Sequence, residues 1–264
     1  MNRIKFNLYP GNKKRAVTFS YDDGRIYDEK MTKIFDRYGA KCTYNLNSNN
    51  LVREGYIDKA FVRELSSRHE IACHSYTHPH LNRIPPDKLI LEIYEDRKAL
   101  EDITGKPVFG MAYPFGSTAD ENVSAALKAC GIKYCRTTAA THAFGIPDNW
   151  RQWHPTCHHD NAVDDARRFV NDRWALPLLY VWGHSYNFND DSSWAILDEL
   201  FEILSAADVW YATNGEIYDY LNAIKGLRIT LNESCVYNPS ATTVYATVDN
   251  KPMAFEAGKT TVLD

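Results

Sequence analysis

The sequence of 264 residues lacks any hydrophobic run near the roughly 18 residues that a membrane-spanning helix needs. It also lacks an excess of positive charge, because 30 lysines and arginines stand against 34 aspartates and glutamates, for a net charge of −4. Without a basic surface, attraction to nucleic acid or to anionic lipid is weak. We therefore expect neither nucleic acid nor a membrane as partner, and the sequence does not indicate the oligomeric state.

Cysteine spacings typical of zinc fingers or disulfide frameworks are also missing. The six cysteines form no CxxC pair, and they are few for a chain of this length. We interpret them mostly as buried free thiols, which favours a reducing compartment. Residues 1–10 contain no long apolar segment of the kind found in signal peptides. Both features predict a cytoplasmic protein, or one whose leader was removed earlier.

Apolar residues, in contrast, are abundant enough for a large core. They make up 44% of the chain, which excludes intrinsic disorder for most of it. From residue 16 onward, short β-branched or aromatic runs alternate with amphipathic stretches, and seven such units predict a closed or nearly closed α/β barrel. Strands are expected at residues 16–21, 42–46, 70–74, 108–112, 133–136, 178–183 and 209–213. Helices are expected at residues 28–38, 56–67, 86–104, 119–130, 162–174, 193–206 and 215–224.

Two segments depart from this alternation. Residues 137–160 form a long stretch rich in Trp, His and Pro, and loops of this length are usually functional lids or rims. After residue 226, short strands are expected at 227–231, 243–248 and 260–263, separated by Asn-Pro-Ser and Asp-Asn-Lys turns. We predict a barrel domain over residues 1–225 and a small antiparallel β appendage over residues 226–264, which is too short to fold alone and packs on the barrel.

Polar side chains with catalytic potential follow several of the predicted strands. Asp22 and Asp23 follow the first strand, His74 and His78 follow the third, and His184 ends the last long apolar strand. Reactive groups collect at the carboxyl ends of parallel strands, so we expect these side chains to converge. Each motif alone is weak evidence, since Asp-Asp-Gly is often only a turn. Their shared position at strand ends favours a functional site.

A divalent metal ion explains this combination of residues. One carboxylate and two imidazoles form a three-ligand site with an open position for a reactive water. Two adjacent aspartates do not easily point the same way, which suits one carboxylate on the ion and the other on its water. The neighbouring cation would keep Asp22 ionised at neutral pH. Zinc is the first expectation, and cobalt, nickel, iron and manganese suit the same ligands.

The motifs resemble those of the polysaccharide deacetylase family, the NodB-homology proteins of carbohydrate esterase family 4. Thr-Phe-Ser-Tyr-Asp-Asp-Gly at 18–24 is similar to the first family motif, and His-Ser-Tyr-Thr-His at 74–78 is similar to the second. Met-Ala-Tyr-Pro-Phe-Gly at 111–116 is similar to the third, and Val-Trp-Gly-His at 181–184 to the last. The resemblance extends over about residues 14–215 and implies a distorted (β/α)7 barrel.

The resemblance also implies a reaction and a role for each central residue. Asp22 is expected to be the general base and His184 the general acid, with Asp23, His74 and His78 as metal ligands. The expected reaction is hydrolysis of an N-acetyl or O-acetyl group on a carbohydrate by metal-bound water, without a covalent acyl-enzyme.

Supporting roles fall to residues of the same motifs. Ser75 is expected to brace the second motif by hydrogen bonding, and the backbone N–H of Phe115, which follows Tyr113 in the third motif, to stabilise an oxyanion. Trp182 is expected to wall the pocket for the acetyl methyl group. Trp150 and Trp153 are also placed where a sugar ring could stack.

The sequence departs from the family pattern at two points. Many members begin the third motif with an Arg that orients the base, and Ala112 stands there. Either Arg136 or Arg151 is expected to replace it from the adjacent loop. The Asp-Trp of the fourth motif is not evident between His142 and Asp164.

These departures leave two alternative functions open. One is a carbohydrate-binding barrel that has lost turnover, and the other is a hydrolase of a cyclic amide or ureide that uses the same metal chemistry. The intact base, acid and ligand set count against a purely binding protein. Among the other histidines, His80 follows a proline and is interpreted as a surface imidazole. His154, His158 and His159 either line the cleft or are solvated.

Overall fold

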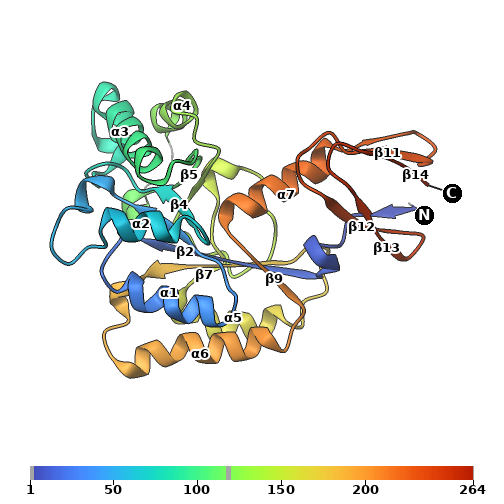
Figure 1. Ribbon diagram of the computed structural model, residues 1–264, viewed down its shortest axis with the longest axis horizontal. Helices are drawn as coiled ribbons and strands as arrows, with labels where there is room; N and C mark the ends of the chain where they lie inside the picture. The colour runs from blue at the N-terminus through green and yellow to red at the C-terminus, as the bar shows by residue number, and fades with distance from the viewer. Residues whose placement is uncertain (1–2, 117–119, 264) are drawn as a thin grey trace.

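A computed structural model describes residues 3–116 and 120–263, and its centre is a curled, all-parallel sheet. The sheet has the strand order β6-β5-β4-β3-β2-β8-β7, and β9 also pairs with β2. The order confirms the predicted barrel of alternating strands and helices (Figure 1). The strands are β2 (Arg15–Asp22), β3 (Thr43–Leu46), β4 (Glu70–Cys73), β5 (Gly110–Ala112), β6 (Tyr134–Arg136), β7 (Cys157–His158), β8 (Leu178–His184) and β9 (Val209–Ala212).

β2 is the central strand, and its side chains are buried on both faces. Residues 16–22 are all buried, as expected for a parallel strand covered on both sides. β2 pairs with β8 along seven residues, from Ala16 opposite Leu178 to Asp22 opposite His184. On its other edge, residues 20–22 pair with β3 and residues 15–18 pair with β9. The last predicted strand, β9, therefore pairs with β2 on the same edge as β3.

The segment around β7 connects the two ends of the curled sheet. The Trp153 N–H donates to the Cys135 carbonyl at 2.9 Å, and the Thr137 N–H donates to the Trp153 carbonyl at 3.0 Å, which joins the segment to β6. Three residues later, the Thr156 N–H donates to the Tyr180 carbonyl of β8 at 2.9 Å. Part of the stretch predicted as a rim loop is thus a wall of the barrel.

Helices cover the outside of the sheet at all seven predicted places (Figure 1). Two of them begin with capping boxes, formed by Asp190 with Ser193 and by Thr213 with Glu216. The helix expected from residue 119 starts at Glu121, and residue 119 lies outside the described residues. The helices are α1 (Asp28–Arg37), α2 (Lys59–Leu65), α3 (Pro86–Thr104), α4 (Glu121–Ala129), α5 (Ala162–Phe169), α6 (Asp191–Ser205) and α7 (Asn214–Gly226).

Short 3-10 turns lie at several strand ends and helix starts. They are η1 (Pro10–Asn12), η2 (Ser48–Asn50), η3 (Leu81–Arg83), η4 (Pro114–Gly116), η5 (Trp150–Gln152), η6 (His159–Asn161) and η7 (Ser185–Asn187). Within the described residues, none of the helices combines the length and the apolar character needed to span a bilayer.

Beyond α7, the predicted antiparallel appendage consists of two small sheets. Their orders are β1-β12-β13 and β10-β11-β14, so the N-terminal strand β1 pairs with β12 and both chain ends meet here (Figure 1). The expected turn before β13 holds Asp249 and Asn250 at positive φ, as a two-residue hairpin requires. The strands are β1 (Ile4–Lys5), β10 (Arg228–Ile229), β11 (Cys235–Tyr237), β12 (Val244–Val248), β13 (Lys251–Phe255) and β14 (Thr260–Val262).

The appendage packs on α7 through its own apolar cluster. Ala223 of α7 lies in one buried cluster with Val236, Val244 and Phe255 of the small sheets. The hydroxyl of Tyr220, also on α7, donates to the Tyr245 carbonyl at 3.3 Å. The division at residues 225 and 226 stays a prediction, and β1 links the first residues of the chain to the second unit.

The cysteine prediction is confirmed for the described residues. All six are free thiols, and Cys42, Cys73, Cys135 and Cys157 are buried in the barrel. The reducing, cytoplasmic location inferred from them stays a prediction.

Asp28 is a buried carboxyl group at the start of α1, and it makes the stability of the fold sensitive to pH. Burial, and then the nearby charges of Asp23 and Asp22, raise the pKa of Asp28 to about 8. In the unfolded chain an aspartate titrates near pH 3.9. The folded protein therefore retains a proton that the unfolded chain releases between these values, and the free energy of unfolding falls as the pH rises from about 4 to about 8.

Replacement of Asp28 by Asn removes this titration without changing the shape of the side chain. We expect Asp28→Asn to be more stable than the unchanged protein at pH 8 by at least about 1 kcal/mol, with a smaller difference at pH 5. Urea denaturation at the two pH values measures the effect. Asp102→Asn on the exposed side of α3 is the matched control. If the free energy of unfolding changes with pH by the same amount in Asp28→Asn and in the unchanged protein, the raised pKa of Asp28 is contradicted.

Candidate active site and metal centre

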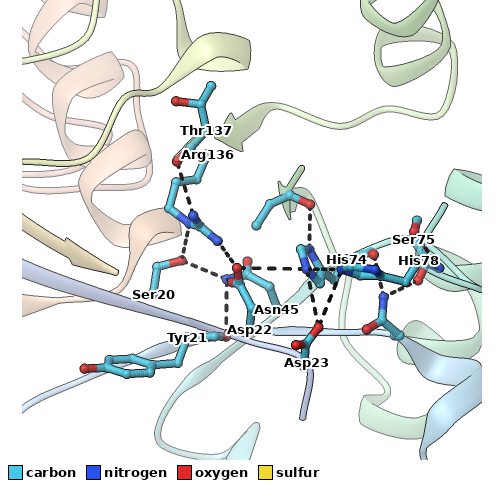
Figure 2. Close-up of polar contacts among 12 residues, drawn as sticks. Ser20, Tyr21, Asp22, Asp23, Asn45, His74, Ser75, His78, Arg136 and Thr137 are labelled. Atoms are coloured by element: carbon cyan, nitrogen blue, oxygen red, sulfur yellow. Dashed lines mark hydrogen bonds and ion pairs between the residues drawn. The ribbon is translucent and has the colours of Figure 1, made fainter. Parts of the chain in front are cut away.

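The predicted site residues come together at the carboxyl ends of the barrel strands (Figure 2). Asp22 is the last residue of β2 and Asp23 follows it, while His74 directly follows β4. His184 ends β8, where it is the register partner of Asp22. The parallel sheet therefore brings together residues that are distant in the sequence.

Asp23, His74 and His78 form a triangle of metal-ligating atoms. The Asp23 Oδ1 atom lies 3.6 Å from the Nε2 atom of each histidine, and the two Nε2 atoms are 3.1 Å apart (Figure 2). Four ligands at about 2.0–2.2 Å from a tetrahedral ion are themselves separated by about 3.3–3.6 Å. The three side chains therefore fit one small divalent cation.

The contacts of His74 prepare its Nε2 atom for a ligand. Its Nδ1 atom lies 2.8 Å from the Ala112 carbonyl, which can only accept, so Nδ1 carries the proton and Nε2 keeps a free lone pair. The backbone N–H of His74 donates to the buried carboxyl group of Asp96 at 2.9 Å. Burial, and then the adjacent His74, lower the pKa of His78 to about 4, so that the His78 imidazole is neutral near pH 7.

The ligand loops have an unusual backbone. Asp23, Ser75 and His78 have φ values of 79°, 65° and 62°, in the left-handed region that non-glycine residues rarely adopt. The His78 N–H donates to the buried Ser75 hydroxyl at 3.1 Å, and the Asn47 side chain donates to the Ser75 carbonyl at 2.8 Å. Such conformations persist only where the surroundings hold them, and they cluster at functional sites.

Asp22 is buried and both of its oxygens accept hydrogen bonds. Arg136 donates from Nη2 to Oδ2, and Asn45 donates to Oδ1 at 2.9 Å (Figure 2). Arg136 also donates to the Ser20 hydroxyl at 3.2 Å, and it is fully buried. Burial alone would raise the pKa of Asp22, but the positive charge of Arg136, followed by His74, lowers it below the ordinary value. The carboxyl group is therefore ionised at neutral pH.

The structure places one of the two arginines left open by the sequence beside Asp22. Arg136 on β6 is the register partner of Ala112 on β5, so the guanidinium comes from the neighbouring strand at the same level of the barrel. Arg151 lies on η5 and contacts the third motif through its backbone, where its carbonyl accepts the Tyr113 hydroxyl at 2.6 Å. Arg136 therefore occupies the place beside Asp22.

Trp182 lies between the base and the acid candidates. Its ring is 4.6 Å from the Arg136 guanidinium and 5.6 Å, edge to face, from the His184 ring. Indole rings attract cations over their face, so Trp182 stabilises the Arg136 guanidinium. Its contact with the His184 imidazole is a packing contact between two aromatic rings.

The three histidines of the long loop differ in their surroundings. His158 on β7 packs against Trp182 at 4.9 Å and is 2.9 Å from the Asp160 carboxylate, so it lies beside the site. His159 is buried, and its ring stacks on Tyr21. His154 contacts the Thr137 hydroxyl at 2.6 Å, away from the triangle of ligands.

Phe115 places an aromatic ring beside the metal ligands. The side chain is 59% exposed, and its ring lies 4.4 Å from His78 and 4.0 Å, stacked, from His80. His80 therefore pairs with Phe115 rather than joining the ligand triangle. Phe115 also has a left-handed backbone conformation, with φ 56°.

Tyr186 is a site residue that the sequence reasoning missed. Its hydroxyl donates to Asp23 Oδ2 at 3.3 Å, and its ring lies 5.0 Å from the ring of His184. The sequence feature that points to Tyr186 is its position two residues after His184, which itself ends a predicted strand.

Comparison with known proteins agrees with this architecture. Residues 10–135 match the family model of polysaccharide deacetylases. Over 92 residues, which are 34% of this chain and 21% of the relative, the sequence is 32% identical to a protein of Arthroderma benhamiae named "Probable peptidoglycan-N-acetylglucosamine deacetylase". The chain thus spans about a fifth of that relative's length.

The similarity to solved structures covers more of the chain than the segment that matches the family model. The Xyl-CE4 domain of a multidomain xylanase from the hindgut metagenome of Trinervitermes trinervoides superimposes with a TM-score of 0.59 at 17% identity, covering 80% of this chain and 93% of that one. A family 4 acetyl xylan esterase from Clostridium thermocellum, in complex with a cobalt ion, gives a TM-score of 0.56 at 15% identity, covering 77% and 90%.

These comparisons show the fold of the chain and a partial match to one family. The fold is the NodB-type barrel of carbohydrate esterase family 4. The matched segment then confirms that the motifs resemble those of the polysaccharide deacetylase family.

The buried pair of Asp22 and Arg136 gives a testable consequence for stability. Arg136→Met leaves the Asp22 carboxylate without its cation, so we expect the free energy of unfolding at pH 7 to fall by about 3–5 kcal/mol. Asp22→Asn/Arg136→Met should recover part of this loss because no buried charge remains. Denaturation of the two single variants, the double variant and the unchanged protein measures the coupling. Strictly additive losses would show that the two side chains do not act as a pair.

Proposed function

We propose that this protein is a metal-dependent deacetylase that hydrolyses an N-acetyl or O-acetyl group on a carbohydrate. The observation that carries the proposal is the convergence of Asp23, His74 and His78 on one point, beside the ionised carboxylate of Asp22. The family match supports acetyl removal as the reaction. The named activities of the relatives, on peptidoglycan N-acetylglucosamine and on acetyl xylan, support an acetylated carbohydrate as the substrate class.

Asp23, His74 and His78 would hold the metal ion. A divalent ion in this place supplies Lewis-acid activation of the acetyl carbonyl and makes water more acidic. The ligand set suits zinc first and also cobalt, nickel, iron or manganese, and a cobalt ion is present in one structural neighbour. The oxygen and nitrogen donors of the site therefore agree with the proposed chemistry.

Asp22 takes the proton from the attacking water in this proposal. Arg136 and Asn45 each hold one of its oxygens, so the carboxylate cannot turn away, yet each oxygen retains a further lone pair. Because its pKa is lowered, Asp22 is ionised and ready to accept a proton at neutral pH. A positioned base of this kind contributes about 10²–10⁴-fold to a rate.

His184 gives a proton to the departing nitrogen or oxygen. It is the register partner of Asp22 across β2 and β8, so base and acid lie on adjacent strands at one level of the barrel. The Phe115 N–H, on its left-handed turn, is the candidate donor to the oxyanion. Acetate and the free amine or hydroxyl are the products.

The pairing of Arg136 with Asp22 argues against an inactive barrel. Ala112 and the missing Asp-Trp were the two sequence features that suggested lost turnover, and the Arg136 guanidinium from β6 contacts Asp22 in place of a side chain from residue 112. A binding protein has no need for an oriented base and a facing imidazole in one cleft.

Hydrolysis should depend on the carboxylate of Asp22 while metal binding does not. We expect Asp22→Asn to lower acetate release at least about 100-fold and to retain the bound metal ion, since the ligand triangle is unchanged. Acetate release is measured on acetylated chitin, xylan and peptidoglycan oligosaccharides, with a cyclic ureide as the alternative substrate. A fully active Asp22→Asn protein would refute the role of the base, and turnover of the ureide alone would refute the substrate class.

Removal of the metal ion should abolish activity reversibly. After chelation we expect no acetate release, with recovery on addition of Zn²⁺, Co²⁺ or Ni²⁺. His78→Ala should weaken metal binding by more than about 100-fold, because loss of an outer-shell partner alone costs 10–100-fold. His154→Ala, which lies away from the triangle, is the matched control. Full activity in the chelated protein would exclude a metal-dependent mechanism.

A further inference from the structure

We propose that Tyr186 is a positioning residue that holds two parts of the site at once, the carboxylate of Asp23 and the imidazole of His184. The inference rests on the proposed metal-dependent function. It concerns a residue outside the four motifs, on the turn η7 (Ser185–Asn187) that directly follows β8. The hydroxyl and the ring of Tyr186 have separate tasks, so two substitutions can test them independently.

The hydroxyl of Tyr186 holds the oxygen of Asp23 that is not directed at the metal position. Asp23 Oδ1 lies 3.6 Å from both histidine Nε2 atoms, whereas Oδ2 accepts the Tyr186 hydroxyl at 3.3 Å. An aspartate carboxylate rotates easily about its last bond, because that torsion has no sharp minimum. The hydrogen bond selects the rotation in which one oxygen points at both imidazoles.

Asp23 has few other restraints on its carboxylate. Among the described residues, only the Tyr186 hydroxyl donates a hydrogen bond to that carboxylate, and the Nε2 atoms of the two candidate ligands lie 3.6 Å from its Oδ1 atom. Asp22, in contrast, is held by Arg136 and Asn45. Outer-shell partners of this type commonly determine metal affinity because they orient the ligand before the ion arrives.

The ring of Tyr186 restricts the proposed acid. His184 lies between two aromatic rings, with Tyr186 at 5.0 Å, tilted by 34°, and Trp182 at 5.6 Å, nearly edge to face. Removal of either ring leaves the imidazole free to turn. Because a displacement of about 1 Å at a reacting group can cost 100-fold in rate, this restraint bears on turnover rather than on metal affinity.

Tyr186 is itself held by the loop that follows β2. The Arg25 guanidinium lies 4.5 Å from the Tyr56 ring and 6.0 Å from the Tyr186 ring. Arg25 is two residues after Asp23. The loop after β2 therefore contacts Tyr186 twice, through the Asp23 carboxylate and through the Arg25 guanidinium. Tyr186 remains 38% exposed, and its position is therefore not explained by the hydrophobic core.

Three variants separate the two tasks. Tyr186→Phe removes the hydroxyl and keeps the ring, Tyr186→Leu removes both, and Tyr237→Phe on β11 is a control of similar exposure, 36%, in the appendage. The dissociation constant for Zn²⁺ is measured by competition with a chromogenic chelator, which does not require activity. Values of kcat and KM for acetate release are then measured at saturating Zn²⁺, and thermal unfolding of the metal-free proteins confirms that each variant folds.

We expect Tyr186→Phe to weaken Zn²⁺ binding by about 10–100-fold, with kcat at saturating Zn²⁺ within about threefold of the unchanged protein because the ring still restrains His184. Tyr186→Leu should weaken Zn²⁺ binding equally and also lower kcat at least about tenfold. Tyr237→Phe should change neither quantity. A purely structural role would instead lower the unfolding temperature and leave the Zn²⁺ dissociation constant unchanged.

The outcomes distinguish this inference from the proposed function. Unchanged Zn²⁺ affinity in Tyr186→Phe, in a protein that binds Zn²⁺ and releases acetate, overturns the role of the hydroxyl and leaves the proposed function intact. Unchanged kcat in Tyr186→Leu overturns the role of the ring. If the unchanged protein itself binds no Zn²⁺, then the proposed function and this inference both fail.

Discussion

The buried ion pair of Asp22 and Arg136 determines how the interior of the barrel is arranged. The two residues come from β2 and β6, with three strands between them in the sheet, and their side chains are 3% and 0% exposed. An isolated charge at this depth is very unfavourable, so each side chain offsets the cost of burying the charge of the other. Because the pair crosses the barrel, it sets the separation of strand ends on opposite sides, and the position of Asp23 depends on that separation.

The parts of the site that could be predicted are those encoded locally. Asp22, Asp23, His74, His78 and His184 each stand directly at or after an apolar strand, and parallel strands must present their carboxyl ends together. The choice between the two arginines depends instead on strand register, a property of the folded sheet. Once β5 and β6 pair in parallel, residue 136 lies opposite residue 112, and the Arg136 side chain reaches Asp22 from β6.

Elements defined by tertiary pairing escaped prediction for the same reason. β7 has two residues, too few for a periodic pattern, and it exists because its backbone groups pair with β8. β13 contains Pro252, which lowers the strand signal, although an edge position tolerates it. Tyr186 belongs to no motif, and only the folded turn brings its hydroxyl to Asp23.

The pairing of β1 with β12 has a consequence for how the molecule is made. Asn7 and Thr247 share a hydrogen bond although 240 residues separate them. The first strand leaves the ribosome long before its partner exists, and at about 5–20 residues per second the delay is roughly 12–50 s. Throughout that interval the edge of β1 must stay unpaired while the barrel assembles beside it. The sheet β1-β12-β13 can thus form only after β12 has been made, and a chain released before that point would expose the unpaired edge of β1.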